Sequence, residues 1–517
     1  MTATRLGDPP AWVADAVFYQ VFPDRFRRSG RVDAPGPLEE WDDPPTVHGF
    51  KGGDLYGVGE GLDHLTDLGV TAIYLNPIFA SASNHRYHTY DYLAVDPLLG
   101  GDAALRELLD AAHARGMRVV LDGVFNHASR GFWPFHHVME LGRHSPYRDW
   151  FHLHAEDLAA GRPLRAYSGE PPPTAIATDW AEAHASGSDS ITTLGYRAWW
   201  DLPALPKLNT DNPVVREYLM GVAEHWGRFG IDGWRLDVPG EITTPGFWEE
   251  FRQRVRGANP EAYIVGEIWQ ERGDLLDGRT YDALMNYPLA AAIVGHVTGS
   301  HLDLRVVAQH GELERQIKPI DAAGFLARIE RVCRAYDPRF ARSMLNVIST
   351  HDTPRFRSMA GGDTASLRLG WLVLLTMPGA PCFYYGDEIG LAGEMDPGCR
   401  AAFPWDAARW DRDLLAHLGA LVRARRDMPV LRSADYRSLA AVGMASAYQR
   451  GPGGPGSVVV ALNAGEDDAT LEIPAIEGMF DEVRLPGGPD PARVTPGDDG
   501  SLRLALPART GRLFRLS

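Results

Sequence analysis

The chain has 517 residues, and 51 lysines and arginines against 68 aspartates and glutamates give it a formal charge of −17. This length predicts three or four domains at roughly 100–200 residues each, or fewer if one of them is a large barrel. The acidic surplus, without any run of basic residues, argues against nucleic acid or an anionic membrane as a main partner.

The cysteines and the first residues indicate the compartment. Cys333, Cys382 and Cys399 are too few and too scattered for a disulfide framework or a CxxC metal site. The first twenty residues lack a basic segment followed by an apolar one, and no window contains about eighteen consecutive apolar residues. We therefore expect a cytoplasmic protein that does not span a membrane.

Short runs of β-branched and aromatic residues recur along the chain, separated in several places by longer amphipathic stretches. Near-continuous apolar runs are typical of strands that are buried on both faces, as parallel strands are. The amphipathic stretches 103–115 and 213–229 predict helices between them. The alternation predicts a (β/α)₈ TIM barrel. The eight runs lie at 17–23, 71–78, 118–125, 233–238, 263–269, 283–288, 344–351 and 381–389.

The spacing of the runs is uneven in one place, and the pattern changes near the C-terminus. From Phe125 to Gly233 there are 108 residues, far more than one crossover helix requires, so we expect a small domain inserted after strand 3. After a helical stretch at 407–426, short alternating segments predict a C-terminal antiparallel β-sandwich. The expected boundaries are 1–126 and 206–429 for the barrel, 127–205 for the inserted domain and 430–517 for the β-domain.

Polar residues follow several of the predicted strands at the point where each strand ends. An isolated polar residue there is more often a helix cap or a turn residue than a catalyst. In a barrel, however, the C-terminal ends of the strands meet on one face, where the active site lies. We therefore treat them as one candidate site: Asp122, Asn126 and His127 after the third run, Arg235 and Asp237 in the fourth, Glu267 and Trp269 in the fifth, and His351 and Asp352 in the seventh.

This set of side chains suits glycoside hydrolysis, which needs a proton donor and a carboxylate at the oxocarbenium-like carbon. Arg235 precedes Asp237 by two residues on the same strand face and would keep that carboxylate ionised, as a nucleophile requires. Glu267 is flanked by apolar residues, a dry setting that favours a general acid. Hydrogen bonds to sugar hydroxyls and to the reacting sugar are expected from His127, His351 and Asp352.

Four motifs carry a resemblance to the α-amylase family of glycoside hydrolases: DGVFNH at 122–127, GWRLDV at 233–238, GEIW at 266–269 and STHDT at 349–353. They occur in the family's order, and the resemblance covers nearly the whole chain. It implies that Asp237 is the nucleophile, Glu267 the general acid/base and Asp352 the transition-state stabiliser, with retention at the anomeric carbon. It also implies substrate contacts by Arg235, His127 and His351, and a structural role for Asp122, beside which Asn126 lies in the same motif.

Further segments resemble the neopullulanases, cyclomaltodextrinases and maltogenic amylases. LPKLN at 205–209 differs in its first residue from their MPKLN, and similar segments are FYQVFPDRF, NHRYHTYDY and DPGCR. The resemblance implies that Tyr87 stacks on the sugar at the cleavage site and that Trp269 faces the leaving group. It also implies that Asp396 and Arg400 bind the next sugar on the non-reducing side. Without the motif, Tyr87 would be taken for an ordinary packing aromatic.

The sequence departs from that group in two places. Relatives usually begin with a β-domain of over a hundred residues that helps to form a dimer, whereas the first strand is expected here by residue 17. We expect that domain to be absent, and a homodimer is left open. Where many relatives have an Asn-Glu pair after the nucleophile, this chain has VPGE at 238–241. Preference among α-1,4, α-1,6 and cyclic substrates therefore stays open, and cyclic maltosyl-maltose is among the candidates.

Other signals are weaker. GVGEG at 57–61 lacks the context of a phosphate loop, and the histidines have no zinc spacing. We expect no cofactor and predict no metal site, although a structural calcium ion at Asp24, Asp33 and Asp54 stays open. Two other functions compete with the hydrolase of short or cyclic maltooligosaccharides. One is an exo-acting α-glucosidase or oligo-1,6-glucosidase, which more often carries QPDLN, and the other is a sugar-binding or transporter-associated barrel that has lost its catalytic carboxylates.

Overall fold

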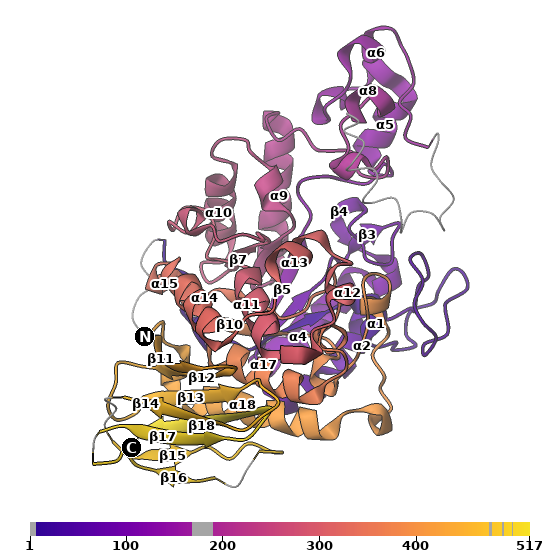
Figure 1. Cartoon of the computed structure of the whole chain (residues 1–517). Coiled ribbons are helices and arrows are strands. Elements are labelled where there is room, and N and C mark those ends of the chain that lie inside the picture. The colour runs from indigo at the N-terminus through magenta and orange to yellow at the C-terminus, as the bar shows by residue number, and fades with distance from the viewer. Residues whose placement is uncertain (1–6, 168–189, 475–477, 489–490, 499, 517) are drawn as a thin grey trace. The chain divides into compact units, whose positions relative to one another are not determined.

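The computed structural model describes residues 7–167, 190–474, 478–488, 491–498 and 500–516 (Figure 1). Residues 168–189 of the expected inserted domain therefore lie outside the described residues. The chain folds into two compact units. One contains Met1–Val21, Gly61–Ile73 and Ile268–Ser517, and the other contains Phe22–Glu60 and Tyr74–Glu267.

Eight strands form one sheet in the order β8-β7-β6-β5-β2-β1-β10-β9. The pairs β5–β6, β6–β7, β1–β10 and β10–β9 are parallel. A parallel bridge between Met285, next to β8, and Leu345 in β9 joins the two ends of this order, so the barrel is nearly closed. The predicted TIM barrel is confirmed. Its strands are β1 (Phe18–Val21), β2 (Ala72–Leu75), β5 (Arg118–Gly123), β6 (Gly233–Leu236), β7 (Tyr263–Gly266), β8 (Ala283–Leu284), β9 (Leu345–Asn346) and β10 (Ala380–Tyr384).

Local sequence signals determine where the barrel helices begin and end. Helix α9 (Pro213–Phe229) has the predicted bounds because the Asn212 side chain accepts a hydrogen bond from the Val214 N–H and Pro213 occupies the first turn. It ends at Gly230, whose φ of 117° few other residues adopt. Helix α4 (Gly101–Ala114) begins two residues earlier than expected.

The helix predicted at 407–426 begins later than expected. Asp406 caps a separate 3₁₀ turn (Ala407–Arg409), and Asp411 caps helix α18 (Arg412–Asp427) by accepting from the Leu414 N–H. Two successive aspartate caps divide the stretch, because each one starts a new helix. Further α-helices are α1 (Pro23–Phe26), α2 (Leu55–Glu60), α3 (Leu62–Leu68), α10 (Phe247–Ala258), α11 (Tyr287–Val297), α12 (Leu304–Val307), α13 (Gly311–Gln316), α14 (Ala322–Arg334), α15 (Pro338–Ala341), α16 (Phe356–Met359) and α17 (Thr364–Thr376).

Two long connections leave the barrel at its strand ends. The first follows β2 and contains an antiparallel hairpin, β3 (Phe79–Ser81) and β4 (Thr89–Val95), that the strand pattern did not predict. The second follows β5 and contains α5 (Trp133–Leu141), α6 (Ala155–Ala159) and α8 (Ser190–Leu194) among its described residues. It occupies the place expected for the inserted domain, whose boundaries stay a prediction.

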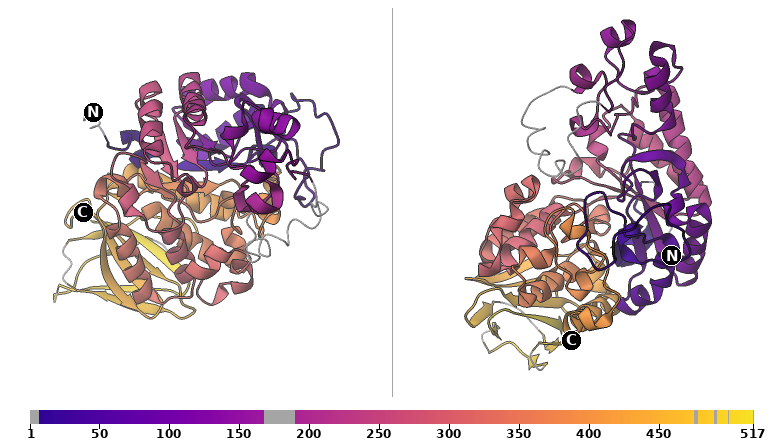
Figure 2. Two further views of the ribbon diagram at one scale, coloured as in Figure 1. Left: turned by 90° about the horizontal axis from the view of Figure 1, so that it is seen from above. Right: turned by 90° about the vertical axis from the view of Figure 1, so that its right-hand side faces the viewer.

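The C-terminal strands form the predicted antiparallel β-domain (Figures 1 and 2). A six-stranded sheet and a two-stranded sheet share one apolar core, to which Val459 and Phe514 contribute from the first and Leu471 and Leu504 from the second. The strands are β11 (Arg437–Val442), β12 (Ala445–Arg450), β13 (Val458–Asn463), β14 (Ala469–Ile473), β15 (Phe480–Glu482), β16 (Arg493–Val494), β17 (Leu502–Leu506) and β18 (Thr510–Leu516).

Strand β12 was not predicted, although it is buried along its whole length. It ends in Arg450, a residue type that normally indicates a surface. The guanidinium is buried because it donates to the carbonyl oxygens of Thr376, Leu431, Ser433 and Asp435. Since these partners lie 15 to 74 residues away from Arg450, the local hydrophobic pattern gives no sign of them.

Candidate active site

One arginine organises the candidate site at the ends of three neighbouring parallel strands. Arg235 on β6 is fully buried, and the strand register places it beside Asp122 on β5. Its Nη1 lies 2.9 Å from Asp122 Oδ1 and 3.1 Å from Asp237 Oδ1, and its Nη2 lies 2.9 Å from Glu267 Oε2. The structure thus brings the expected nucleophile and the expected general acid/base to one guanidinium.

The cluster contains three carboxyl groups and only one guanidinium. Burial opposes the charge on Arg235, but Asp122 and Glu267 outweigh it, so the arginine pKa is raised well above its ordinary value. Burial raises the pKa of Asp122, and the Arg235 guanidinium and two tyrosine hydroxyls oppose that shift. Three buried carboxyl groups therefore face one positive charge, and mutual repulsion favours a proton on one of them.

Glu267 is buried, as the dry setting expected from its neighbours requires. It is also ion-paired with Arg235. This pair was not predicted, and it favours the carboxylate form of Glu267. Its Oε2 accepts a hydrogen bond from the Val238 N–H at 3.1 Å. Val238 has a φ of 35°, a strained conformation for a β-branched residue. This strained turn directs the backbone after Asp237 toward Glu267.

The Tyr87 hydroxyl is part of the same network. It donates to Asp122 Oδ2 at 2.7 Å and accepts from Asn76 Nδ2 at 3.1 Å. The Tyr74 hydroxyl donates to the same Asp122 oxygen at 2.8 Å. Tyr87 is therefore more than a packing aromatic. Tyr74 and Asn76 were not predicted. Asn76 directly follows strand β2, where the same reasoning about strand ends applies, and Tyr74 lies two residues before it.

Replacement of Tyr87 by Phe should lower the free energy of unfolding by about 1–3 kcal/mol, because Asp122 loses a hydrogen bond to a buried carboxylate. The ring is retained, so KM for a glucan should change little, whereas Tyr87→Ala should raise KM. Chemical denaturation and steady-state kinetics measure both effects. Tyr196→Phe is a matched control, because that hydroxyl donates to a backbone carbonyl, that of Pro203, and the acceptor is uncharged. Equal losses of stability in the two Phe variants would contradict the role given to Tyr87.

His127 is oriented as a donor for a ligand. Burial lowers its pKa to about 3, so the ring is neutral. Asn126 Nδ2 lies 3.3 Å from His127 Nδ1, and an amide donor there places the ring proton on Nε2. By hydrogen-bond geometry that buried Nε2 has no partner among the described residues, although the Tyr87 backbone acts on the pKa of the ring. The expected contact to a sugar hydroxyl stays a prediction.

A second cluster, in the other unit, surrounds Asp352. Its carboxylate lies 3.0 Å from His351 Nε2 and 3.2 Å from Arg400 Nη2, and its side chain is 32% exposed. Arg400 also pairs with Asp396 at 2.9 Å, so the structure brings these four expected residues together. Gln20 Nε2 donates to His351 Nδ1 at 2.8 Å, which places the imidazole proton on Nε2, facing Asp352. Gln20 lies in FYQVFPDRF but was not predicted.

Trp269 lies in a stack of aromatic rings. Its ring centroid is 3.7 Å from that of Tyr287 and 4.7 Å from that of His310, and both pairs are nearly parallel. Two rings so close to one centroid cannot share a face, so they cover opposite faces of the indole. A ligand can therefore reach only the edge of Trp269 in this arrangement. The expected contact with the leaving-group side stays a prediction.

Two of the three aspartates considered for calcium, Asp24 and Asp54, have protein partners. Asp24 accepts from the Lys51 and Gly52 N–H groups and pairs with Arg25, and Asp54 accepts from Ser29 and the Gly57 N–H. Among the described residues, no three His, Cys, Asp or Glu side chains are grouped so that they could hold a metal ion. These carboxylates stabilise turns.

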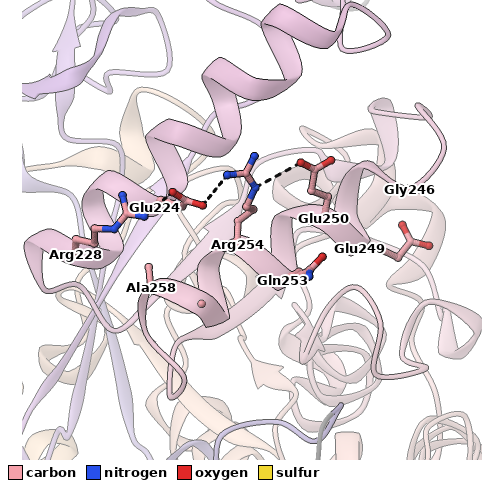
Figure 3. Close-up of a pocket in the computed structure, with 9 residues that line it drawn as sticks. Glu224, Arg228, Gly246, Glu249, Glu250, Gln253, Arg254 and Ala258 are labelled. Carbon is pink, nitrogen blue, oxygen red and sulfur yellow. Dashed lines mark hydrogen bonds and ion pairs between the residues drawn. The ribbon is translucent and has the colours of Figure 1, made fainter.

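A groove of about 760 Å³ lies between helices α9 and α10, and none of the candidate residues lines it (Figure 3). Charged side chains line it, and they pair with one another. Arg254 Nη1 lies 2.9 Å from Glu224 Oε1, and Arg228 lies 2.7 Å from the other oxygen of Glu224 (Figure 3). The groove is thus a surface ion-pair network, and none of its residues was predicted to bind a ligand.

A parallel barrel with paired carboxylates at the C-terminal ends of its strands has the architecture of a glycoside hydrolase. The family description "Alpha amylase, catalytic domain" matches residues 20–432. The chain belongs to the alpha-amylase family, and it is a glycoside hydrolase of that family. This confirms the resemblance carried by the four motifs.

Three relatives show which members of the family the chain is similar to. The chain is 40% identical over 435 residues to a cyclomaltodextrinase from a Bacillus species, a match that covers 84% of this chain and 69% of that protein. It is 46% identical to the solved structure of Ttha1563 from Thermus thermophilus, with a TM-score of 0.86 over 98% of this chain and 100% of that one. It is 43% identical to the Nostoc punctiforme debranching enzyme, with a TM-score of 0.83 over 98% and 99%.

Other homologues carry related names. They include neopullulanase 2 of Thermoactinomyces vulgaris, intracellular maltogenic amylase of Bacillus subtilis and cyclic α-maltosyl-(1→6)-maltose hydrolase of Arthrobacter globiformis. The predicted group of homologues is confirmed. In the parts of the chain that the structure describes, we find no helix with the length and apolar character needed to cross a membrane.

Proposed function

We propose that the protein hydrolyses short and cyclic maltooligosaccharides by two displacements with retention, including substrates that contain α-1,6 bonds. Asp237 attacks the anomeric carbon while Glu267 protonates the departing glycosidic oxygen, and the C–O bond breaks. Water then attacks the glycosyl–enzyme ester, Glu267 removes its proton, and Asp237 leaves as a carboxylate. A hydroxyl of a second sugar in place of water gives transglycosylation.

The observation that supports these roles most strongly is the shared guanidinium of Arg235. It pairs with both Asp237 and Glu267 at the ends of adjacent parallel strands. A general acid must carry a proton before the first step, so we assign one to Glu267. Repulsion among the three carboxyls of the cluster favours this proton, and the ion pair with Arg235 opposes it. Asp237 then keeps the charge of a nucleophile.

The resemblance supplies the role of Asp352, which we propose binds hydroxyls beside the reacting carbon and responds to its developing positive charge. His351 and Arg400 hold its two oxygens. Arg400 and Asp396 would then bind the next sugar on the non-reducing side.

The LPKLN segment, which resembles the relatives, contacts the VPGE segment, in which this chain departs from many of them. Lys207, in LPKLN, donates through Nζ to the carbonyl oxygen of Glu241 at 2.9 Å and lies 3.3 Å from its carboxylate. Glu241 closes the VPGE segment that follows the nucleophile. The names of the Nostoc and Arthrobacter relatives, a debranching enzyme and a hydrolase of a cyclic α-1,6-linked maltosyl-maltose, support α-1,6 bonds as substrates of this chain.

A product time course on cyclodextrin, pullulan, maltotriose, panose and a cyclic maltosyl-maltose tests the substrate proposal. We expect the cyclic substrates to open to linear maltooligosaccharides, and panose and pullulan to be cleaved at α-1,6 bonds. Asp237→Asn run in parallel controls for contaminating activity. Release of glucose alone from chain ends, with the cyclic substrates intact, would instead establish the exo-acting α-glucosidase. Inactivity on all five would indicate the sugar-binding barrel.

We also propose that the protein acts in the cytoplasm. The three cysteines are free thiols, and one relative is named as an intracellular amylase. A homodimer stays a prediction, which light scattering on the purified chain can measure.

A further inference from the structure

A buried ion pair contacts the two segments that carry Asp352 and Arg400, in the same unit. Asp387 follows strand β10, and its Oδ1 lies 2.9 Å from Nη1 of Arg355. Both side chains are almost completely buried, and neither was part of the predicted site. A buried pair of this kind stabilises a fold poorly, because desolvation of both charges offsets their attraction. Its contacts indicate what else it does.

The carboxylate of Asp387 reaches the loop that carries Asp352. Its Oδ2 accepts a hydrogen bond from the hydroxyl of Ser349, the first residue of the STHDT motif. Three residues further along, Asp352 presents its carboxylate to His351 and Arg400. The loop is therefore attached at one end to a charged group in the 3₁₀ turn Asp387–Ile389, which follows β10.

The guanidinium of Arg355 reaches the segment that carries Arg400. Its Nε donates to the carbonyl oxygen of Cys399 at 3.0 Å, and its Nη1 donates to that of Tyr385 at 2.7 Å. Arg400 in turn donates through Nε to the His351 carbonyl oxygen at 2.9 Å. Arg355 thus holds Cys399, the residue before Arg400. Arg400 contacts one oxygen of the Asp352 carboxylate, and His351 contacts the other.

We propose that Asp387 and Arg355 form a positioning pair for the reaction: together they fix the two segments that orient the carboxylate of Asp352. Neither side chain is assigned a contact with the sugar. Asp387 acts through Ser349, and Arg355 acts through the Cys399 carbonyl. The proposal rests on the role of Asp352 in the proposed function.

Asp387 also makes the pair sensitive to pH. Burial raises the pKa of this carboxyl to about 6, while Arg355 and the Ser349 hydroxyl oppose the shift and the neighbouring Glu388 adds to it. Below that pH the carboxyl is protonated and loses its ion pair with Arg355. Above it, the pair is intact. The carboxylate of Glu388 is itself occupied by the Tyr19 hydroxyl at 2.9 Å and by His64 at 2.8 Å. Cys382 is a further titratable group affected by the charge of Asp387.

The test compares Asp387→Asn with the wild-type chain on cyclodextrin. We expect kcat to fall about 10- to 100-fold with a much smaller change in KM, because a misplaced Asp352 weakens transition-state binding more than substrate binding. The wild type should lose kcat as pH falls through about 6, and this limb should be absent from the variant. Ser349→Ala, which removes one hydrogen bond and leaves the ion pair in place, should lower kcat less than Asp387→Asn does.

Asp363→Asn is the matched control, because Asp363 also pairs with an arginine, Arg509, in the same unit but caps helix α17. It should lose stability and keep the wild-type kcat. Hydrogen exchange gives a readout besides activity: exchange in 349–353 and 398–401 should rise in Asp387→Asn and stay unchanged in Asp363→Asn. The proposal would be overturned if Asp387→Asn kept the wild-type kcat, the loss of kcat below about pH 6 and the wild-type rate of hydrogen exchange. A wild-type chain inactive on every glucan contradicts the proposed function instead, and the exchange data still decide whether the pair holds the two segments.

Discussion

Replacement of Asp237 by Asn is expected to lower kcat by about four orders of magnitude or more, since removing a nucleophile abolishes the covalent route. The amide has nearly the same size as the carboxyl group, and the side chain is only 10% exposed, so the fold should persist. Steady-state kinetics on cyclodextrin measures the loss. Circular dichroism and thermal unfolding show whether the fold remains.

Asp232→Asn controls for the general effect of removing a buried carboxylate beside an arginine. Asp232 pairs with Arg118 at 2.8 Å and precedes strand β6, at the end of the barrel opposite to the site. We expect this variant to lose stability and keep kcat. If Asp237→Asn kept a near-normal kcat, as Asp232→Asn is expected to do, Asp237 would not be the nucleophile.

A chemical rescue makes the assignment specific. In Asp237→Gly, azide should enter the space left by the carboxylate and attack an α-maltosyl fluoride from that face, giving a β-glycosyl azide. Product stereochemistry by NMR reports which face was attacked. An α-glycosyl azide from this variant would mean that another group still forms the covalent intermediate.

Replacement of Glu267 by Gln should lower kcat on glucans by about 10²- to 10⁴-fold, because the leaving oxygen departs without its proton. Maltosyl fluoride needs no protonation to leave, so its first step should be far less affected. We therefore expect the glycosyl–enzyme to accumulate on Asp237, which mass spectrometry of the intact protein would detect as an added maltosyl mass.

Azide separates Glu267 from Asp237. With Glu267→Ala it should react with the glycosyl–enzyme and give an α-glycosyl azide, the opposite anomer to that expected from the Asp237 variant. A loss of activity that is equal for glucans and for the fluoride would argue that Glu267 orients the substrate and does not transfer the proton.

The sequence predicted those features that depend on residues close together in the chain. The eight apolar runs predicted the barrel strands, and the Asn212 and Gly230 signals set the ends of α9. The four motifs led to Asp237, Glu267 and Asp352 without any coordinates, because barrel strands place their C-terminal ends on one face. The unpredicted strand β12 and the divided helix at 407–426 show the limit of this approach, since a buried arginine and a second cap both override the hydrophobic pattern.

What the sequence determined alone is the family, the barrel and the residues at its strand ends. Only the tertiary structure decided how these residues are held. It showed that one guanidinium serves three carboxyls, that Gln20 sets the tautomer of His351, that Tyr74 and Asn76 support Tyr87 and Asp122, and that rings cover both faces of Trp269. Apart from the Arg235–Asp237 pair, these contacts join residues that lie 11 to 331 positions apart. A local pattern cannot encode them, because burial and charge at each atom depend on the segments that folding brings beside it.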